Sequence, residues 1–262
     1  MKSYSMMKRS NWAWPYAFFL LLFVVIPLVL IAVYAFRSYT GGFTLTNFAK
    51  FAHQSETLNT FIYSIGTALT TTIVCIIVGY PAAYILSNSE LTRGKALVML
   101  FILPMWINIL MRSLATVALF DFLHIPLGEG ALIFGLTYDF LPFMIYPIYN
   151  SIQKIDTSYL EAARDLGATK VQTFTRVILP LSVPGIISGI LMVFLPTIST
   201  FAISEILTLN TKRLFGSIIQ DNIMMSDTMN YGAALSLIML VIIGITTALT
   251  HDKDNAEENS LI

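Results

Sequence analysis

Six long apolar runs constrain the fold of this 262-residue chain more than any other feature of its sequence. A helix that crosses the hydrocarbon core of a bilayer needs roughly 20 mostly apolar residues. The runs that reach this length cover residues 15–36, 60–86, 96–120, 131–151, 183–206 and 231–250. Only 11% of the residues are charged, against about 25% in a typical soluble domain. The sequence therefore predicts an all-α membrane protein with six transmembrane helices.

The two ends of the chain differ in character. We expect residues 1–250 to form a single transmembrane domain and the polar, acidic segment 251–262 to be a short disordered tail. The first apolar run could instead be a cleaved signal peptide, because Lys8 and Arg9 precede it and small residues lie near its end. It is, however, longer than the roughly 7–15 apolar residues of a signal core, and further spans follow it. A membrane span is the better interpretation.

Positive charges predict the orientation of the spans, since cytoplasmic loops carry an excess of lysine and arginine. With an even number of spans, the side that holds both termini carries ten such residues outside the spans. The opposite side carries only four, which are Arg37, Lys50, Lys212 and Arg213. Both termini and the segment 154–181 are therefore expected in the cytoplasm, and the segments 37–59 and 207–230 outside.

The segment 154–181 is a charged, amphipathic stretch between two spans, and it predicts two short helices. Gly167 lies between them, where a glycine commonly ends a helix. Apolar residues recur every three or four positions from residue 160 to residue 178, and Pro180 ends the pattern. Two residue pairs have the spacing of capping boxes at helix starts: Ser158 with Glu161, and Thr169 with Gln172.

The same segment resembles the EAA loop of bacterial ABC-importer permeases, because Glu-Ala-Ala at 161–163 is followed at the family's spacing by Gly167 and Pro180. The resemblance implies the type I importer permease fold, with this helix-turn-helix as a cytoplasmic coupling segment. It implies docking on a separate ATP-binding subunit, present as a homodimer, that drives alternating access. Its further implied partners are a second permease subunit, an extracytoplasmic substrate-binding protein and the lipid of the bacterial inner membrane. The docking residues that it implies are Glu161, Ala162, Ala163, Gly167, Phe174 and Pro180.

The flanking sequence from Gly135 to Tyr149 is similar to the B-type permease subunits of spermidine and putrescine importers, which implies a polyamine substrate. An ionised group at bilayer depth normally faces a partner, a cavity or a substrate. Carboxylates and aromatic rings both attract ammonium groups. Asp139 could instead form a structural pair with Arg112, and the rings could simply pack. The candidates for the substrate path are Asp139, Glu205, Trp106, Tyr138, Tyr146 and Phe201.

Several chemical signatures are missing from the sequence. There is no glycine-rich phosphate loop, so we expect a non-catalytic subunit that leaves ATP hydrolysis to a partner. The three histidines are isolated, and Cys75 is the single cysteine, so neither a metal site nor a cofactor is predicted. The net charge of zero argues against nucleic acid. The alternatives are a related importer for an anion or a metal chelate, an intramembrane enzyme that uses Asp139 as an acid, and an ion channel.

Overall fold

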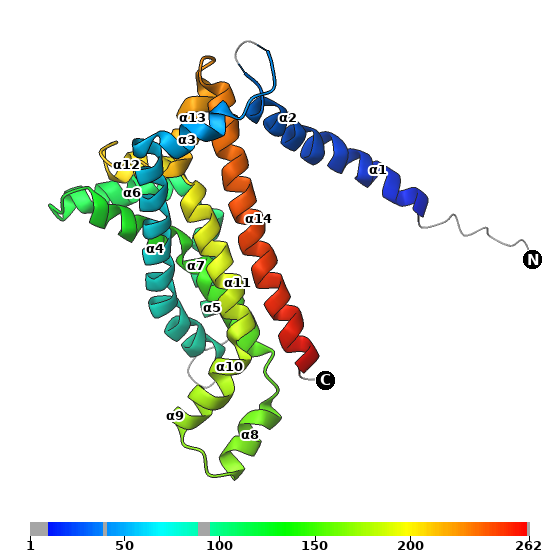
Figure 1. The fold of residues 1–262 in the computed structure, drawn as a ribbon. Helices are drawn as coiled ribbons and strands as arrows, with labels where there is room; N and C mark the ends of the chain where they lie inside the picture. Colours follow the sequence, from blue (N-terminus) through cyan, green and yellow to red (C-terminus); the bar gives the residue numbers. More distant parts are fainter. Residues whose placement is uncertain (1–9, 39–40, 89–94, 261–262) are drawn as a thin grey trace, which may run out of the picture. The chain divides into compact units, whose positions relative to one another are not determined.

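The computed structural model describes residues 10–38, 41–88 and 95–260, and helices dominate it (Figure 1). Four helices are long and apolar enough to cross a bilayer: Trp14–Ala35, Ser55–Ser87, Glu129–Gln153 and Met229–Ala248. The number rises to six if each of two bent helix pairs is one span, and these pairs are Val98–Trp106 with Ile109–Phe122 and Lys170–Leu181 with Val183–Ser199. The prediction of an all-α membrane protein is confirmed. The chain divides into two compact units.

The first unit, Met1–Ser55 with Ile219–Ile242, contains the N-terminal helical run. α1 (Ser10–Leu20), a π-helical turn (Leu21–Val25) and α2 (Ile26–Ala35) follow one another without a break. Every side chain from Trp14 to Leu30 is exposed, and most of them are apolar. A helix that is apolar on all sides is typical of a membrane span.

Two short connections hold the rest of the first unit together. The side-chain nitrogen of Asn47, in α3 (Thr46–His53), donates to the backbone oxygens of Ala35 at 2.9 Å and Arg37 at 3.2 Å. Ala233 and Ala234 of α14 (Met229–Ser260) pack against Ala35. Gly41, between α2 and α3, has a φ of +93°, which suits glycine.

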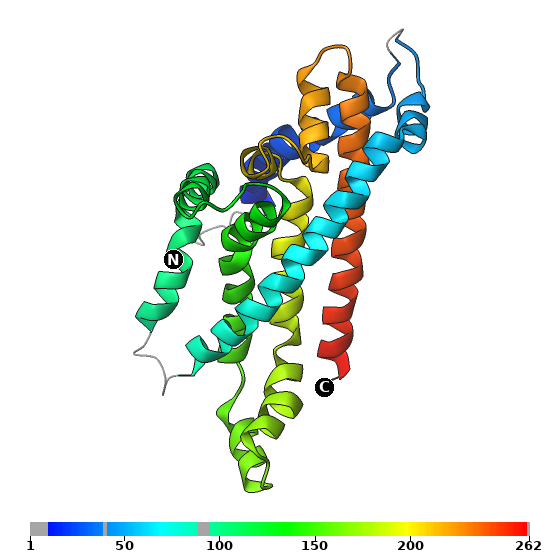
Figure 2. The ribbon, with the colours of Figure 1, turned by 90° about the vertical axis from the view of Figure 1, so that its left-hand side faces the viewer.

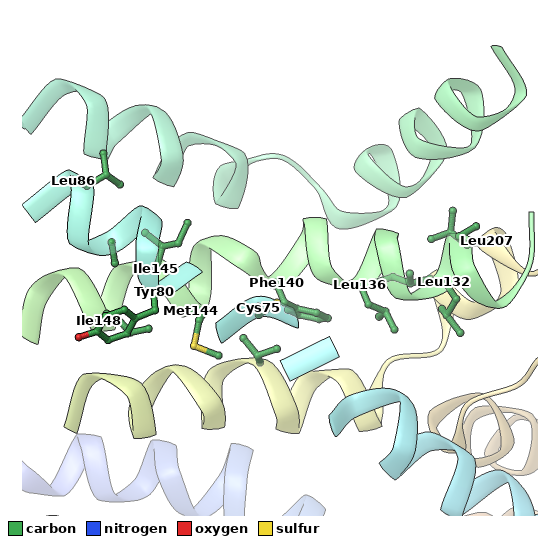
Figure 3. Close-up of a cluster of buried hydrophobic side chains, with 14 of the residues drawn as sticks. Cys75, Tyr80, Leu86, Leu132, Leu136, Phe140, Met144, Ile145, Ile148 and Leu207 are labelled. Atoms are coloured by element: carbon green, nitrogen blue, oxygen red, sulfur yellow. The ribbon is translucent and has the colours of Figure 1, made fainter. Parts of the chain in front are cut away.

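The second unit, Glu56–Ile218 with Ile243–Ile262, is built around α7 (Glu129–Gln153). Figure 3 shows its buried side chains beside Cys75 and Tyr80 of α4 (Ser55–Ser87) and Leu207 of α12 (Ala202–Leu207). On its other side α7 lies very close to α11 (Val183–Ser199). A Cβ atom at Gly185 would lie 2.5 Å from the Cβ of Ser151, so only glycine permits this approach.

The third predicted span, residues 96–120, is not one helix, which corrects the sequence prediction. α5 (Lys95–Ile102) and a 3-10 turn (Leu103–Trp106) precede α6 (Ile109–Phe122), and the two parts are bent by 102°. Pro104 lacks the N–H needed to continue the helix, and the side chain of Asn108 caps α6 by accepting from the Leu110 N–H at 2.8 Å. α5 and the turn rise only about 20 Å, too little for a core of ~30 Å. In Figure 1, α6 runs across the long axis of α7, and Figure 2 shows the same two helices turned by 90°.

The fifth predicted span and the tail also differ from the prediction. α11 ends at Ser199, and extended backbone at Thr200 separates it from α12, so residues 183–206 are not continuous. α13 (Phe215–Met224) begins directly against the end of α11, because a Cβ at Gly216 would lie 2.1 Å from the backbone oxygen of Ser199. The tail, expected to be disordered, continues α14 as a helix to Ser260, since no glycine or proline follows Gly244 to stop it.

Candidate functional site

The segment between α7 and α11 folds as a helix-turn-helix. α8 (Thr157–Asp165) is followed by a turn, α9 (Lys170–Thr173), a π-helical turn (Phe174–Ile178) and α10 (Leu179–Leu181). The predicted capping box at Thr169 is present. The Gln172 N–H donates to Thr169 Oγ1 at 3.3 Å, and the Thr169 N–H donates to Gln172 Oε1 at 2.9 Å. In Figure 1, α8 and α9 protrude beyond the ends of α7 and α11.

The start of α8 corrects the other predicted capping box. Asp156, and not Ser158, is the N-cap, because Asp156 Oδ1 accepts from the Ser158 N–H at 2.9 Å. This hydrogen bond holds the pKa of Asp156 below its usual value, since it stabilises the charged carboxylate. Aspartate caps a helix as well as serine does, so two adjacent candidates could not be separated by residue type. Glu161 is an exposed side chain on α8.

Gly167 forms the turn between the two helices. Its φ of +75° lies in the left-handed region, and its N–H donates to the Arg164 carbonyl at 2.8 Å. The next N–H, of Ala168, donates to the carbonyl of Ala163 at 3.0 Å. A residue with a Cβ would pay about 1–2 kcal/mol for this backbone conformation. The predicted role of Gly167 as a helix stop is confirmed by this geometry.

Large apolar side chains are exposed at the tip of the protrusion. Leu166 is 89% exposed and Val171 71%. Ala162 is exposed beside them, whereas Ala163 is half-buried against its own helix pair. A cluster of exposed apolar side chains at the end of a protruding segment is typical of a protein interaction site. We name these residues, Ala162, Leu166 and Val171, the tip surface.

Phe174 connects the helix-turn-helix to α4. Its ring packs edge-on against Tyr84, with centroids 5.1 Å apart, and against Tyr80 at 5.8 Å. The Tyr80 hydroxyl lies 2.8 Å from the Ser182 hydroxyl, and both side chains are buried. Ser182 occupies the 60° bend between Lys170–Leu181 and α11. Pro180 sits in the first turn of α10, so the helical run ends at Leu181 and not at Pro180 as predicted.

Asp139 is completely buried and ion-paired. Its Oδ1 lies 3.2 Å from Arg112 Nε, and its Oδ2 accepts from the Ser113 hydroxyl at 3.3 Å. A terminal guanidinium nitrogen of Arg112 donates to the backbone oxygen of Asp139 at 3.2 Å, and the guanidinium lies 5.8 Å from the ring centre of Tyr138. The pair joins α6 to α7. This geometry fits the alternative in which Asp139 forms a structural pair with Arg112, and not the one in which it lines the substrate path.

The remaining candidates for the substrate path lie on other elements. Glu205 is half-buried in the first turn of α12, and Phe201 is exposed at its N-cap. Trp106 is 85% exposed, at the bend that precedes α6. Tyr138 and Tyr146 are exposed on α7, eight residues apart. The structure therefore does not gather all six candidates into one cluster.

Tyr138 and Tyr146 each belong to a pair of side chains on α7 that are four residues apart. Positions that repeat every four residues lie on the same side of a helix. Phe134 with Tyr138, and Tyr146 with the half-buried Asn150, are such pairs, but Pro142 between them is buried and eight residues turn the helix by about 80°. α7 therefore presents two separate patches of aromatic and amide side chains. Such a surface can line a path for a cation, because rings attract ammonium groups.

Sequence reasoning missed the residues that couple these elements. Tyr80 and Ser182 are 102 positions apart, so no local pattern relates them. The close approach of α11 to α7 depends on Gly185 and Gly189, where a Cβ would lie 2.6 Å from Met144 Sδ in the second case. Their Gly-x-x-x-Gly spacing is a common signal for tightly packed membrane helices. Among the described residues, no group of three or more His, Cys, Asp or Glu side chains could hold a metal.

Comparison with known proteins gives consistent matches. Residues 75–251 match the family described as "binding-protein-dependent transport system inner membrane component". The spermidine/putrescine transport system permease protein PotB of Escherichia coli K12 is 34% identical over 249 residues, covering 86% of this chain and 90% of that protein. PotB of Haemophilus influenzae is 34% identical over 252 residues, covering 86% and 87%.

Solved structures agree in fold. A chain of the bacterial alginate ABC transporter, in complex with an alginate-pentasaccharide-bound periplasmic protein, superposes with a TM-score of 0.70 at 18% identity. The match covers 92% of this chain and 91% of that chain. The arrangement of α4, α7 and α11 around the helix-turn-helix is therefore the type I ABC importer permease fold, and the chain belongs to the family of binding-protein-dependent transport system inner membrane components.

Proposed function

We propose that this chain is the membrane-spanning permease subunit of an ATP-driven polyamine importer. The observation that carries the proposal is the tip surface, an apolar cluster held on a preformed helix-turn-helix outside the core of its unit. Exposing the apolar side chains of Leu166 and Val171 to water is unfavourable in free energy, and burial against a second protein would remove that exposure. The partner proposed is an ATP-binding subunit, and the chain itself performs no catalysis.

The coupling to the spans is proposed to pass through Phe174. A displacement of α9 moves the Phe174 ring, which lies against Tyr80 and Tyr84 of α4. The hydrogen bond from Tyr80 to Ser182 carries the same displacement to the bend before α11. ATP-driven closure of the partner can shift the spans only if the partner binds the two states with different affinity. The contacts of Phe174 and Ser182 connect the tip surface to two spans, so that a change in the docked partner is transmitted to both spans.

A polyamine is the substrate best supported. The relatives named as spermidine/putrescine permeases share 34% identity along most of this chain. Tyr146 of α7 provides an exposed ring of the kind that ammonium groups prefer. Glu205 is the acid we assign to the path, because the carboxylate of Asp139 is already neutralised by Arg112. The same pairing weakens the case for an anion importer, which would need Arg112 free.

The substrate assignment is tested by uptake of labelled spermidine into cells that express the full transporter and lack other polyamine importers. Glu205→Gln removes one charge with little change of shape, and should lower uptake several-fold at equal protein level. Asp121→Asn is the matched control, since Asp121 is an exposed carboxylate at the end of α6. A wild-type transporter that takes up no labelled spermidine, at the same protein level, would rule out this substrate.

The orientation is also a proposal, with both termini and the helix-turn-helix in the cytoplasm and a binding protein and second permease as further partners. A cysteine at Thr211, which is exposed, should react with an impermeant thiol reagent from outside intact cells. A cysteine at the exposed Lys170 should react only after permeabilisation. Cys75 is buried and should contribute no background, and Ser217, although in the same outer segment, is too buried to label. Labelling of Lys170→Cys in intact cells would reverse the orientation.

A further inference from the structure

A cleft opens where α7 meets the helix-turn-helix. It has a volume of about 610 Å³ and lies between the end of α7, the linker to α8 and the first turns of α11. Gly185 forms part of its floor, where α7 and α11 are in direct contact. Tyr146 and Met192 line the part between α7 and α11, and Asp156 and Tyr159 line the part beside α8, which we call its mouth. Between Tyr146 and the end of α7 the helix rises about 10 Å, so the cleft is elongated along the spans.

The walls of this cleft are polar and aromatic. Tyr146 and Tyr159 contribute two rings, and Asn150 contributes an amide between them. Within the part of the chain that the structure describes, none of these three side chains makes a hydrogen bond. Groups of this kind inside a concave surface are available to a ligand. Tyr146 is also one of the candidates for the substrate path, so the cleft contains one of those residues.

Two opposite charges lie at the mouth. The carboxylate of Asp156 is kept ionised by the Ser158 N–H, and it lies where a cation would leave the cleft toward the cytoplasm. Lys154 lies beside it and opposes a cation. One attractive and one repulsive charge give a site that binds a cation weakly. Weak binding is what an exit site needs, because conduction requires that the ligand also leave.

We propose that this cleft is a cytoplasmic exit site for the polyamine, formed by Tyr146, Asn150, Tyr159 and Asp156 and weakened by Lys154. A linear polyammonium chain suits an elongated cleft in which rings face its charges and methylene groups meet Met192 and the aromatic walls. The inference rests on the proposed polyamine transport. It predicts that spermidine on the cytoplasmic side slows import by occupying this cleft.

The test uses the complete transporter in proteoliposomes, with spermidine loaded inside at graded concentrations. The initial rate of ATP-driven uptake gives the internal concentration that halves import. Asp156→Asn removes the charge but keeps the helix cap, because asparagine is an equally good N-cap. This variant should need about two- to five-fold more internal spermidine, the effect of one exposed ion pair. Lys154→Gln should need correspondingly less, and the control Asp121→Asn should match the wild type.

Each outcome separates the possibilities. If the wild type imports no spermidine at all, the proposed function fails. If the wild type imports spermidine but both cleft variants keep its response to internal spermidine, the exit site is wrong and the function stands. If the variants change import only when phosphatidylethanolamine is included in the vesicles, the cleft holds a zwitterionic lipid headgroup and the proposal is wrong.

Discussion

The hydrogen bond between Tyr80 and Ser182 gives the sharpest prediction about coupling. Tyr80→Phe removes only the hydroxyl and keeps the ring that packs edge-on against Phe174. The hydroxyl of Ser182 keeps its second bond, to the carbonyl of Leu179 at 2.9 Å, so it is not left without a partner. The cost is therefore that of one net hydrogen bond, ~1 kcal/mol. If the bond is present in only one of the two transport states, the equilibrium between them shifts about five-fold.

Such a shift should appear as uncoupling. ATP hydrolysis and spermidine uptake are measured together in proteoliposomes, and the number of ATP molecules hydrolysed per imported spermidine should rise several-fold in Tyr80→Phe. Ser182→Ala should produce a similar rise, and the double variant should add little, because both changes remove the same bond. A change in fold alone would lower hydrolysis and uptake together without changing their ratio.

Tyr84→Phe is the matched control. Tyr84 lies against the same Phe174 ring, but its hydroxyl does not contact Ser182 among the described interactions. Its loss should leave the ratio unchanged. An unchanged ratio in Tyr80→Phe, at full uptake, would refute the idea that this bond transmits movement from the helix-turn-helix to the spans.

Three further predictions concern the turn at Gly167, the helix contact at Gly185 and the buried pair of Asp139 with Arg112. Gly167→Leu should weaken co-purification of the ATPase subunit, because a φ of +75° costs a non-glycine residue about 1–2 kcal/mol, while Gly167→Asn should retain more binding; equal binding by both variants would contradict this. Gly185→Ala should lower the free energy of unfolding by about 1–3 kcal/mol, because its Cβ would lie 2.7 Å from the carbonyl oxygen of Pro147. Gly66→Ala should not lower it, because no atom lies within 4 Å of a Cβ at that position. Asp139→Asn should destabilise the protein by about 3–5 kcal/mol because it leaves Arg112 buried without its counter-charge, and Arg112→Met in addition should restore part of the loss; a stable single variant would argue against a structural pair.

The sequence was sufficient to predict the helices that have only one reasonable interpretation. Apolar runs of bilayer length predict spans regardless of their neighbours, and α4, α7 and α14 contain the corresponding runs. Gly167 was predictable because a glycine between two capped helices has few other roles. These features depend on local chemistry, which one sequence contains in full.

The missed features depend on choices between similar local signals or on distant residues. Pro104 and Asn108 interrupt a run that remains apolar throughout, so hydropathy alone cannot reveal the 102° bend. Asp156 and Ser158 are both good caps, and the structure decides between them through one hydrogen bond. The contact of Tyr80 with Ser182 requires the arrangement of α4 beside α11, which no pattern within either helix specifies.

The central claim is that this chain forms the polyamine path of an ATP-driven importer, and one measurement tests it directly. The permease, its partner permease, the ATPase subunit and the binding protein are reconstituted in proteoliposomes with ATP on the ATPase side, and labelled spermidine is added on the other side. Accumulation inside above the outside concentration, lost with a non-hydrolysable ATP analogue or without the binding protein, is the predicted result. Failure to accumulate spermidine or putrescine, in a preparation whose ATPase is stimulated by the binding protein carrying another solute, would contradict it.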